Sequence, residues 1–414
     1  MKKIFITFVA AALTMTACTS DDDDQQRVSD RTQITFAHPV MYGVSRAVGE
    51  INGIYPTTEK FFVSGMKYPA AAYPGWASST QVFYNLCEEF AYDEQSIGKG
   101  WFSTKMYFFE DGMKYAFSAY SPSSIITTNT AQTTGASQAH TVTYDAKGLN
   151  LTNYYCGDIG NQTDLMYAPR IYDIVGGNMA HTGNGNATYD GVNLVFKHAL
   201  ASVHFRTFVD PTYMKMEKDI YGNTIATGNY KIKSIILKNV NMNGDFCENI
   251  DESVTPRTEA PAWTAQSNIP ADGICFLNAL KTVGGDAEND NVDVVVKTED
   301  INSDIATLGK DVTRDITTLY PNDDITTKGQ SGIMIPQTFA PDAAIEVRWI
   351  HKYMASGTER QDHYTSIIPL KDHTTEWLPG KRYIYNLVFK GNLILFKPAV
   401  DDWTDEDINI NIQQ

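Results

Sequence analysis

The sequence predicts an all-β protein built from antiparallel β-sandwiches. Short alternating or apolar runs recur at roughly ten-residue spacing and are separated by Gly, Pro, Asn and Asp. The chain holds 23 Tyr and 19 Phe, and aromatic residues favour half-buried pleated strands. Long amphipathic helical patterns are scarce. Because 414 residues exceed what one hydrophobic core usually supports, we expect two domains.

The first residues have the pattern of a lipoprotein signal. Lys2 and Lys3 precede an apolar stretch that is too short for a stable membrane span, so residues 1–17 are predicted to be a signal peptide. Cys18 follows two small residues of the kind that a lipoprotein signal peptidase accepts, which predicts lipid on its sulfur and a membrane-anchored protein. An ordinary signal peptide that contains a cysteine is the alternative. The aspartates at 21–24 repel one another, so residues 18–30 are predicted to be an acidic tether.

The strand patterns of the first half begin at residues 32–40, where Ile34 and Phe36 share one face. Further strands are expected at residues 60–66, 105–109, 114–120, 139–144 and 164–168. One short helix is allowed by the pattern of residues 85–92. Gly and Asn are concentrated in residues 173–191, which indicates a flexible loop. We therefore expect an N-terminal domain over residues 31–188 and a C-terminal domain over residues 189–414.

The second half continues the same pattern. Strands are expected at residues 192–208, 230–240, 274–277, 292–297, 331–335, 344–351, 382–390 and 393–396. The last residues alternate strictly, with Ile408, Ile410 and Ile412 on one face. These three side chains could enter a groove of another molecule together, or they could belong to an ordinary edge strand.

The net charge of the chain limits the kinds of partner that we expect. The formal net charge is −16, and loss of residues 1–17 with Lys2 and Lys3 would make it −18. An acidic body argues against nucleic acid and anionic membrane surfaces as partners.

Besides Cys18, the four cysteines at 87, 156, 247 and 275 show no close paired spacing. Free thiols are favoured over two disulfides, although both are compatible with the sequence.

Catalytic and metal-binding patterns are missing from the sequence. It has neither His-Glu-x-x-His nor Gly-x-Ser-x-Gly. Eight histidines are scattered along the chain, and packed or solvated roles explain them better than metal binding does. We expect no enzymatic activity, no cofactor and no metal site.

Several short segments carry a resemblance to a known family. They are QITF at 33–36, SRA at 45–47, FVSG at 62–65, LVFKHALASVHF at 194–205, MIPQT at 334–338, WLPGKRYIYN at 377–386 and VDDW at 400–403. In this order the segments resemble the fimbrillin family of the Bacteroidota, whose members are subunits of type V pili. The resemblance implies two tandem transthyretin-like antiparallel β-sandwich domains. The acidic run after Cys18 also looks like the surface-export signal of lipoproteins in that group.

The resemblance implies a route of assembly as well. In this family a lipidated precursor is trimmed by an arginine-specific protease, and Arg46–Ala47 is the best candidate bond here. Cleavage there would release residues 18–46 and leave unpaired backbone groups for a strand of another subunit. Residues Ile408, Ile410 and Ile412 form the candidate donor strand. Anchor subunits of the family are not trimmed, and the sequence leaves the roles of shaft, tip and anchor open.

The leading prediction is therefore a structural and adhesive subunit of a cell-surface fimbria. Its expected partners are other pilus subunits, the outer membrane through lipid on Cys18, and host or bacterial surface ligands. A surface lipoprotein that binds glycans is the alternative, with exposed tryptophans among Trp76, Trp101, Trp263 and Trp377 as stacking platforms. A glycosidase on a β scaffold is a third hypothesis, and no motif supports it.

Overall fold

The computed structural model describes most of the chain between residues 32 and 402. The described residues are 32–37, 39–42, 55–83, 87–93, 100–123, 130–133, 136–139, 141–157, 159, 162–176, 180–184, 187–209, 215–218, 224–227, 230–265, 272–278, 292–294, 314–315, 332–356, 358–390 and 392–402. Their regular structure consists of strands and two 3-10 helices, η1 (Trp76–Ser78) and η7 (Leu370–Asp372). The all-β prediction is confirmed. No helix within these ranges is long and apolar enough to cross a membrane.

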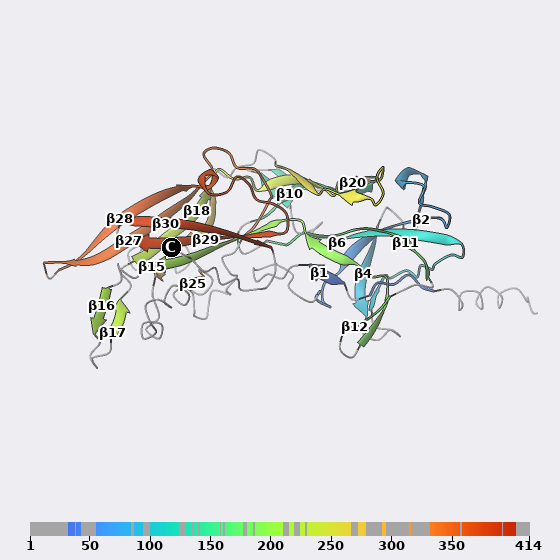
Figure 1. Ribbon diagram of the computed structural model, residues 1–414, viewed down its shortest axis with the longest axis horizontal. Coiled ribbons are helices and arrows are strands. Elements are labelled where there is room, and N and C mark those ends of the chain that lie inside the picture. The colour runs from blue at the N-terminus through green and yellow to red at the C-terminus, as the bar shows by residue number, and fades with distance from the viewer. Residues whose placement is uncertain are drawn as a thin grey trace, which may run out of the picture.

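The first sheet is formed mainly by the first half of the chain (Figure 1). Its strands, in spatial order, are β1 (Val40–Tyr42), β14 (Val195–His198), β11 (Met166–Ile174), β6 (Met113–Ser121), β2 (Phe61–Pro69), β4 (Glu88–Asp93) and β5 (Gly100–Phe102), and β3 (Thr80–Gln81) pairs with β2. All neighbours are antiparallel except β1 and β14, which are parallel. One face covers an aromatic core that includes Phe61, Phe90, Trp101 and Phe117.

Two five-stranded sheets form a sandwich in the second half of the chain. One has the order β25 (Arg314–Asp315), β15 (Ala201–Val209), β29 (Lys381–Lys390) and β30 (Leu393–Asp402), and β26 (Gly332–Met334) also pairs with β15. The other has the order β23 (Ile274–Asn278), β18 (Tyr230–Lys238), β27 (Ala344–Ala355) and β28 (Thr358–Pro369), and β24 (Val292–Val294) also pairs with β18. Aromatic side chains join the two sheets, since the rings of Trp349 and Phe389 lie 5.2 Å apart.

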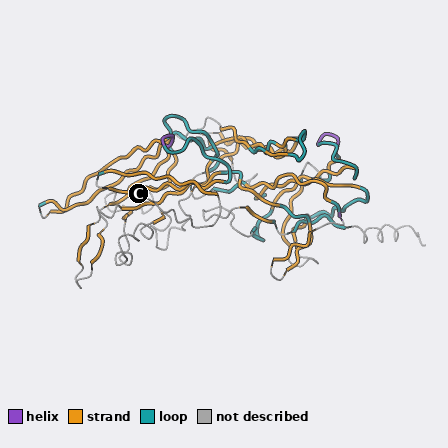
Figure 2. Tube along the Cα trace, in the orientation of Figure 1, coloured by secondary structure: helices purple, strands orange, loops and turns teal. Residues whose placement is uncertain are grey.

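A four-stranded sheet connects the two halves of the chain. Its strands, in order, are β22 (Ala262–Ala265), β19 (Asn243–Cys247), β10 (Gly148–Tyr155) and β9 (Thr141–Asp145). Short hairpins complete the described structure: β7 (Thr130–Thr133) with β8 (Ala136–Ala139), β12 (Ala180–Asn184) with β13 (Ala187–Gly191), β16 (Lys215–Lys218) with β17 (Thr224–Thr227), and β20 (Ile250–Asp251) with β21 (Thr258–Glu259). Figure 2 shows how completely strands and connecting loops account for the fold.

Strand pairing crosses the position at which the sequence predicts a domain boundary, between residues 188 and 189. The predicted strand at residues 192–208 is divided at Ala199 and Leu200 into β14, which joins the first sheet, and β15, which joins the sandwich of the second half. Conversely, β10 pairs with β19 from the second half. Sheets therefore contain strands from both sides of this position, and the division into domains 31–188 and 189–414 stays a prediction.

The helix allowed at residues 85–92 is wrong, because most of this range lies in strand β4 (Glu88–Asp93). β4 pairs with both β2 and β5. The ring of Phe90 is fully buried, and it lies 4.7 Å from that of Phe36. Burial of this one side chain between two neighbouring strands outweighs the weak helical preference of the segment.

Two buried side-chain amides pair with backbone groups in place of a strand, and one of them, Gln162, does so between the two halves of the chain. The Gln162 side chain accepts the Ile333 N–H at 2.7 Å and donates to the Ile333 carbonyl at 2.8 Å. Gln337 does the same with Asn241, at 2.9 Å in both directions. Each glutamine side chain thus donates and accepts hydrogen bonds as the backbone of a neighbouring strand would. It satisfies backbone groups that would otherwise be buried without partners.

Candidate functional site

The candidate site is built around residues 32–37, which we call the inserted segment. On one side its backbone pairs with Trp101: the Phe36 N–H donates to the Trp101 carbonyl at 3.1 Å, and the Trp101 N–H donates back at 2.9 Å. On the other side it pairs with Val192: the Ala37 N–H donates to the Val192 carbonyl at 3.0 Å, and the Val192 N–H donates to Thr35 at 2.8 Å. The segment is thus hydrogen-bonded along both edges.

Further backbone contacts extend this pairing toward the start of the segment. The Ile34 N–H donates to the Tyr107 carbonyl at 2.7 Å, and the Phe109 N–H donates to the Thr32 carbonyl at 2.9 Å. Together with those of Trp101 and Val192, six backbone groups outside the segment are satisfied by it. They would need another partner if the segment left, because buried unpaired groups are costly.

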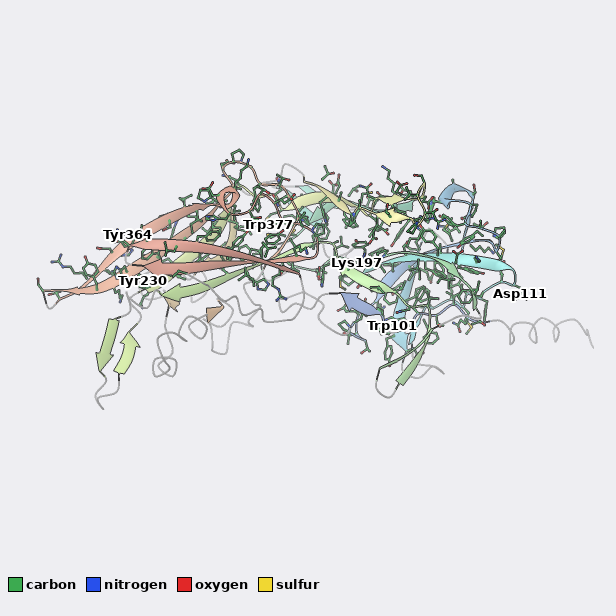
Figure 3. All side chains as sticks on the ribbon, in the orientation of Figure 1. Trp101, Asp111, Lys197, Tyr230, Tyr364 and Trp377 are labelled. Carbon is green, nitrogen blue, oxygen red and sulfur yellow. The ribbon has the colours of Figure 1, made fainter. Side chains whose placement is uncertain are left out.

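The side chains of the inserted segment fill the aromatic core of the first sheet. Ile34 is 1% exposed and Phe36 is fully buried. The Phe36 ring meets those of Phe90 and Phe117 edge to face, at 4.7 and 5.4 Å between centroids. Figure 3 labels Trp101, which lies in the same region of the core. These contacts make the segment part of the core as well as part of the sheet.

A glycine permits the close approach of the segment to the chain around residue 191. A Cβ atom on Gly191 would lie 2.6 Å from the backbone N of Ala37 and 2.8 Å from the carbonyl O of Thr35. Real Cβ contacts are longer, so any other residue would push the inserted segment away. After the segment, β1 pairs in parallel with β14, with Val40 opposite Val195.

The sequence-predicted site residues lie outside the described part of the chain. Cys18 precedes it, and Arg46 and Ala47 fall between the end of β1 at Tyr42 and the next described residue, Tyr55. Ile408, Ile410 and Ile412 follow the end of β30 at Asp402. Sequence reasoning placed Ile34 and Phe36 on one face of a strand at residues 32–40; the structure buries both side chains but has only isolated bridges at Gln33 and Phe36, and the strand β1 begins at Val40. Sequence reasoning missed Trp101, Tyr107 and Val192 as partners of this segment, because no local pattern indicates a pairing between such distant residues.

The tryptophans proposed as glycan platforms are mostly structural. Trp101 is fully buried and Trp377 is 1% exposed, so exposed roles for these two are wrong. Trp76 is half-buried and lies 4.3 Å beneath the Arg170 guanidinium. Trp263 is also half-buried and donates its indole N–H to the Ala199 carbonyl. The four cysteines at 87, 156, 247 and 275 are free thiols.

The described ranges contain no candidate metal site, and their buried histidines have polar partners. No group of three or more His, Cys, Asp and Glu residues in these ranges is placed to hold a metal ion. Two histidines are buried with polar partners: His198 lies 2.6 Å from the Asp164 carboxylate, and His204 lies 2.7 Å from the Ser202 hydroxyl. Both pairs are enclosed in the core, where they satisfy polar groups.

A family model described as fimbrillin-like matches residues 76–403. The chain belongs to the fimbrillin-like family. Among solved structures, this fimbrillin-like protein is similar to a fimbrial protein from Bacteroides vulgatus, at 15% identity and a TM-score of 0.48, with 90% of this chain and 99% of that chain covered. It is also similar to the tip fimbrial protein Mfa3 from Porphyromonas gingivalis, at 9% identity and a TM-score of 0.31, with 90% and 100% covered. No curated protein sequence matches it.

Proposed function

We propose that this fimbrillin-like protein is a structural and adhesive subunit of a cell-surface fimbria. In this proposal it is exported as a lipoprotein, with lipid on Cys18 as its attachment to the outer membrane. An arginine-specific protease then cuts between Arg46 and Ala47. The released piece takes the inserted segment with it, and a strand of another subunit fills the vacated position. The role is structural and involves no catalysis.

The observation that carries the proposal is the two-sided pairing of the inserted segment, which precedes Arg46 in the chain. Its backbone is bonded to Trp101 on one edge and to Val192 on the other. A segment held in this way leaves a strand-shaped vacancy when it departs, and a vacancy of that shape is a template for strand addition. Ile408, Ile410 and Ile412 alternate with polar residues, which is the pattern that such a vacancy selects.

Replacement of the inserted segment by a strand of another subunit is energetically more favourable than loss of the segment alone. Burial of Ile34 and Phe36 stabilises the fold by roughly 1.5–3 kcal/mol each before ordering costs. An incoming strand with three isoleucines would bury a comparable apolar surface. It would also satisfy the same six backbone groups. Because the contact joins different ends of two molecules, its repetition does not close and produces a filament.

Protease treatment followed by electrophoresis without boiling tests the proposal. The wild-type protein should give a ladder of multimers after trimming by an arginine-specific protease. Replacement Arg46→Lys should prevent the cut and the ladder together, whereas Arg27→Lys serves as a matched control that keeps both. Replacement Ile410→Asp should permit the cut and abolish the ladder. Stable monomers after complete cleavage at Arg46 would contradict strand addition.

A further inference from the structure

The β27–β28 hairpin extends beyond the sandwich that it helps to form. Its two strands pair over twelve residue positions, from Ala344 opposite Pro369 to Ala355 opposite Thr358. The neighbouring strand β18 begins at Tyr230, opposite His351, and β29 of the facing sheet ends at Lys390. Figure 1 shows the end of the hairpin at one extreme of the molecule, past the other labelled strands of the sandwich.

A series of neighbouring aromatic rings extends from the core to this projecting end of the hairpin. The Phe389 ring of the facing sheet lies 5.5 Å from that of Tyr230. The His351 ring stacks flat on Tyr230, at 4.7 Å and an interplanar angle of 6°, and Tyr353 lies 5.5 Å beyond His351. Tyr230 is fully buried, whereas His351 and Tyr353 are half-exposed. The Tyr353 ring therefore packs against His351 and remains partly exposed to solvent.

Charged groups lie on the same face of the hairpin as these rings. In the antiparallel register, Tyr353 is opposite Arg360 and His351 is opposite Asp362, and directly opposite residues share a face. The Asp362 carboxylate accepts the Tyr364 hydroxyl at 3.4 Å. It also accepts the Tyr353 hydroxyl, and this hydrogen bond raises the pKa of Tyr353. Figure 3 shows Tyr364 on the hairpin with Tyr230 near it.

The environment of His351 favours its uncharged imidazole. Burial lowers the pKa of His351, and the nearby Asp362 carboxylate opposes that shift only in part. The face thus offers a tyrosine ring, a neutral imidazole, a carboxylate held by two hydroxyls and a guanidinium. This is a mixture of one apolar plane with donors and acceptors around its edge.

We propose that the projecting face of the β27–β28 hairpin binds a saccharide, with Tyr353 as the stacking ring and Asp362 and Arg360 as the groups that hold its hydroxyls. A pyranose has the complementary construction, because one face presents C–H bonds and the edge presents hydroxyls that both donate and accept. Asp362 accepts from such hydroxyls and Arg360 donates to them. Because supporting contacts already fix Tyr353, little side-chain entropy is lost on binding.

This inference does not depend on strand addition. Among the described residues, the hairpin pairs with neither the inserted segment nor β5, so exchange of that segment leaves the face intact. It assigns a ligand class to the adhesive role and relocates the glycan platform from the buried tryptophans to a tyrosine. The two proposals can therefore fail separately.

A printed array of host and bacterial glycans, probed with the full-length protein, tests the inference. We expect a defined subset of glycans to give signal, with loss of at least about tenfold in Tyr353→Ala and a smaller loss in Asp362→Asn and Arg360→Gln. Tyr353→Phe keeps the ring and should retain most of the signal. The matched control is Tyr73→Ala, which removes a half-buried tyrosine bonded to the Glu252 carboxylate in the first half of the chain.

Three outcomes would overturn the inference. They are no wild-type signal above that of Tyr353→Ala, equal signal in all hairpin variants, and signal that an excess of the free glycan fails to displace, which would indicate a different class of ligand. Melting temperature should confirm that the Tyr353 variants remain folded, and Tyr353→Phe gives a readout even if Tyr353→Ala does not fold. Protease-induced ladders of Tyr353→Ala should match those of the wild type, which separates this result from the test of strand addition.

Discussion

At the scale of single residues, Phe36 has the most demanding position in the inserted segment. It is fully buried and contacts Phe61, Phe90 and Phe117 edge to face. Replacement Phe36→Ala should lower the free energy of unfolding by about 3–5 kcal/mol, because it removes the buried ring and leaves a cavity. Urea denaturation of the untrimmed protein measures this loss.

The position of Phe36 in the released piece makes a second measurement informative. If residues 18–46 leave during assembly, the trimmed and assembled protein no longer contains Phe36. Phe36→Ala should then weaken the precursor and leave the thermal stability of the multimers unchanged. Equal destabilisation of both forms would mean that the inserted segment stays in place.

Glu248 makes the stability of the fold depend on pH. Its carboxylate is fully buried and accepts the Leu149 and Arg170 N–H groups at 2.9 and 3.1 Å. Burial raises the pKa of Glu248 to about 7, and the two backbone donors and the Arg170 charge only partly oppose this shift. Since the folded-state pKa is higher than the unfolded value of 4.5, the protonated form stabilises the fold. That stabilisation is complete below pH 4.5 and is lost as pH rises through 7.

Replacement Glu248→Gln should remove this part of the pH dependence. Between pH 4.5 and pH 7.5 the wild type should lose about 3 kcal/mol that the variant does not lose. Other buried groups, such as Asp164, titrate in both proteins and cancel in the comparison. Urea midpoints across this pH range test the difference, and parallel curves for the two proteins would refute it.

At the scale of elements, Gly191 controls how closely the inserted segment approaches its neighbour. Gly191→Ala should displace residues 35–37 and speed hydrogen exchange at the Ala37 and Val192 amides, because the bonds from these amides to the Val192 and Thr35 carbonyls lengthen. Gly112→Ala is the control: Gly112 has a φ of +72°, but a Cβ there would meet nothing within 4 Å. It should cost about 1 kcal/mol from backbone strain and leave exchange at residues 37 and 192 unchanged.

At this scale, the positions of the strands were more predictable from the sequence than the pairing between strands. The alternation of residues 60–66 and 114–120 corresponds to β2 and β6, which are adjacent antiparallel strands. The parallel pairing of β1 with β14 and the pairing of β10 with β19 had no local signal, because both depend on the packing of distant side chains. The break at Ala199 and Leu200 was hidden for the same reason: an apolar run has the same pattern whether it serves one sheet or two.

The candidate site shows the same limit. Alternation placed Ile34 and Phe36 on one buried face, and the resemblance to fimbrillins suggested that this segment could be removed. Only the structure shows that this segment is bonded along both edges, to Trp101 and Val192. Two-sided pairing is a property of three distant segments together, so no pattern within one of them reports it.

At the scale of the whole molecule, charge should oppose assembly. Residues 1–46 hold five basic and five acidic side chains, so trimming leaves a formal net charge of −16 on each subunit. Subunits that repel one another meet slowly, and salt screens that repulsion. The Debye length falls from about 30 Å at 0.01 M salt to about 8 Å at 0.15 M. Multimer formation by trimmed protein should therefore become severalfold faster over this range, with little change in multimer stability.

The measurement separates assembly from proteolysis. Trimming is completed at low salt, the protease is inhibited, and salt is then raised while unboiled samples are taken over time. A protein that lacks residues 408–414 should remain monomeric at every salt concentration if these residues supply the donor strand, which also excludes salt-induced aggregation as the source of the ladder. A rate that falls with salt would mean that subunits meet through complementary charged surfaces, since only attraction between unlike charges is weakened by screening. In that case local charge at the two contacting ends, and not the net charge of the subunit, would govern the encounter.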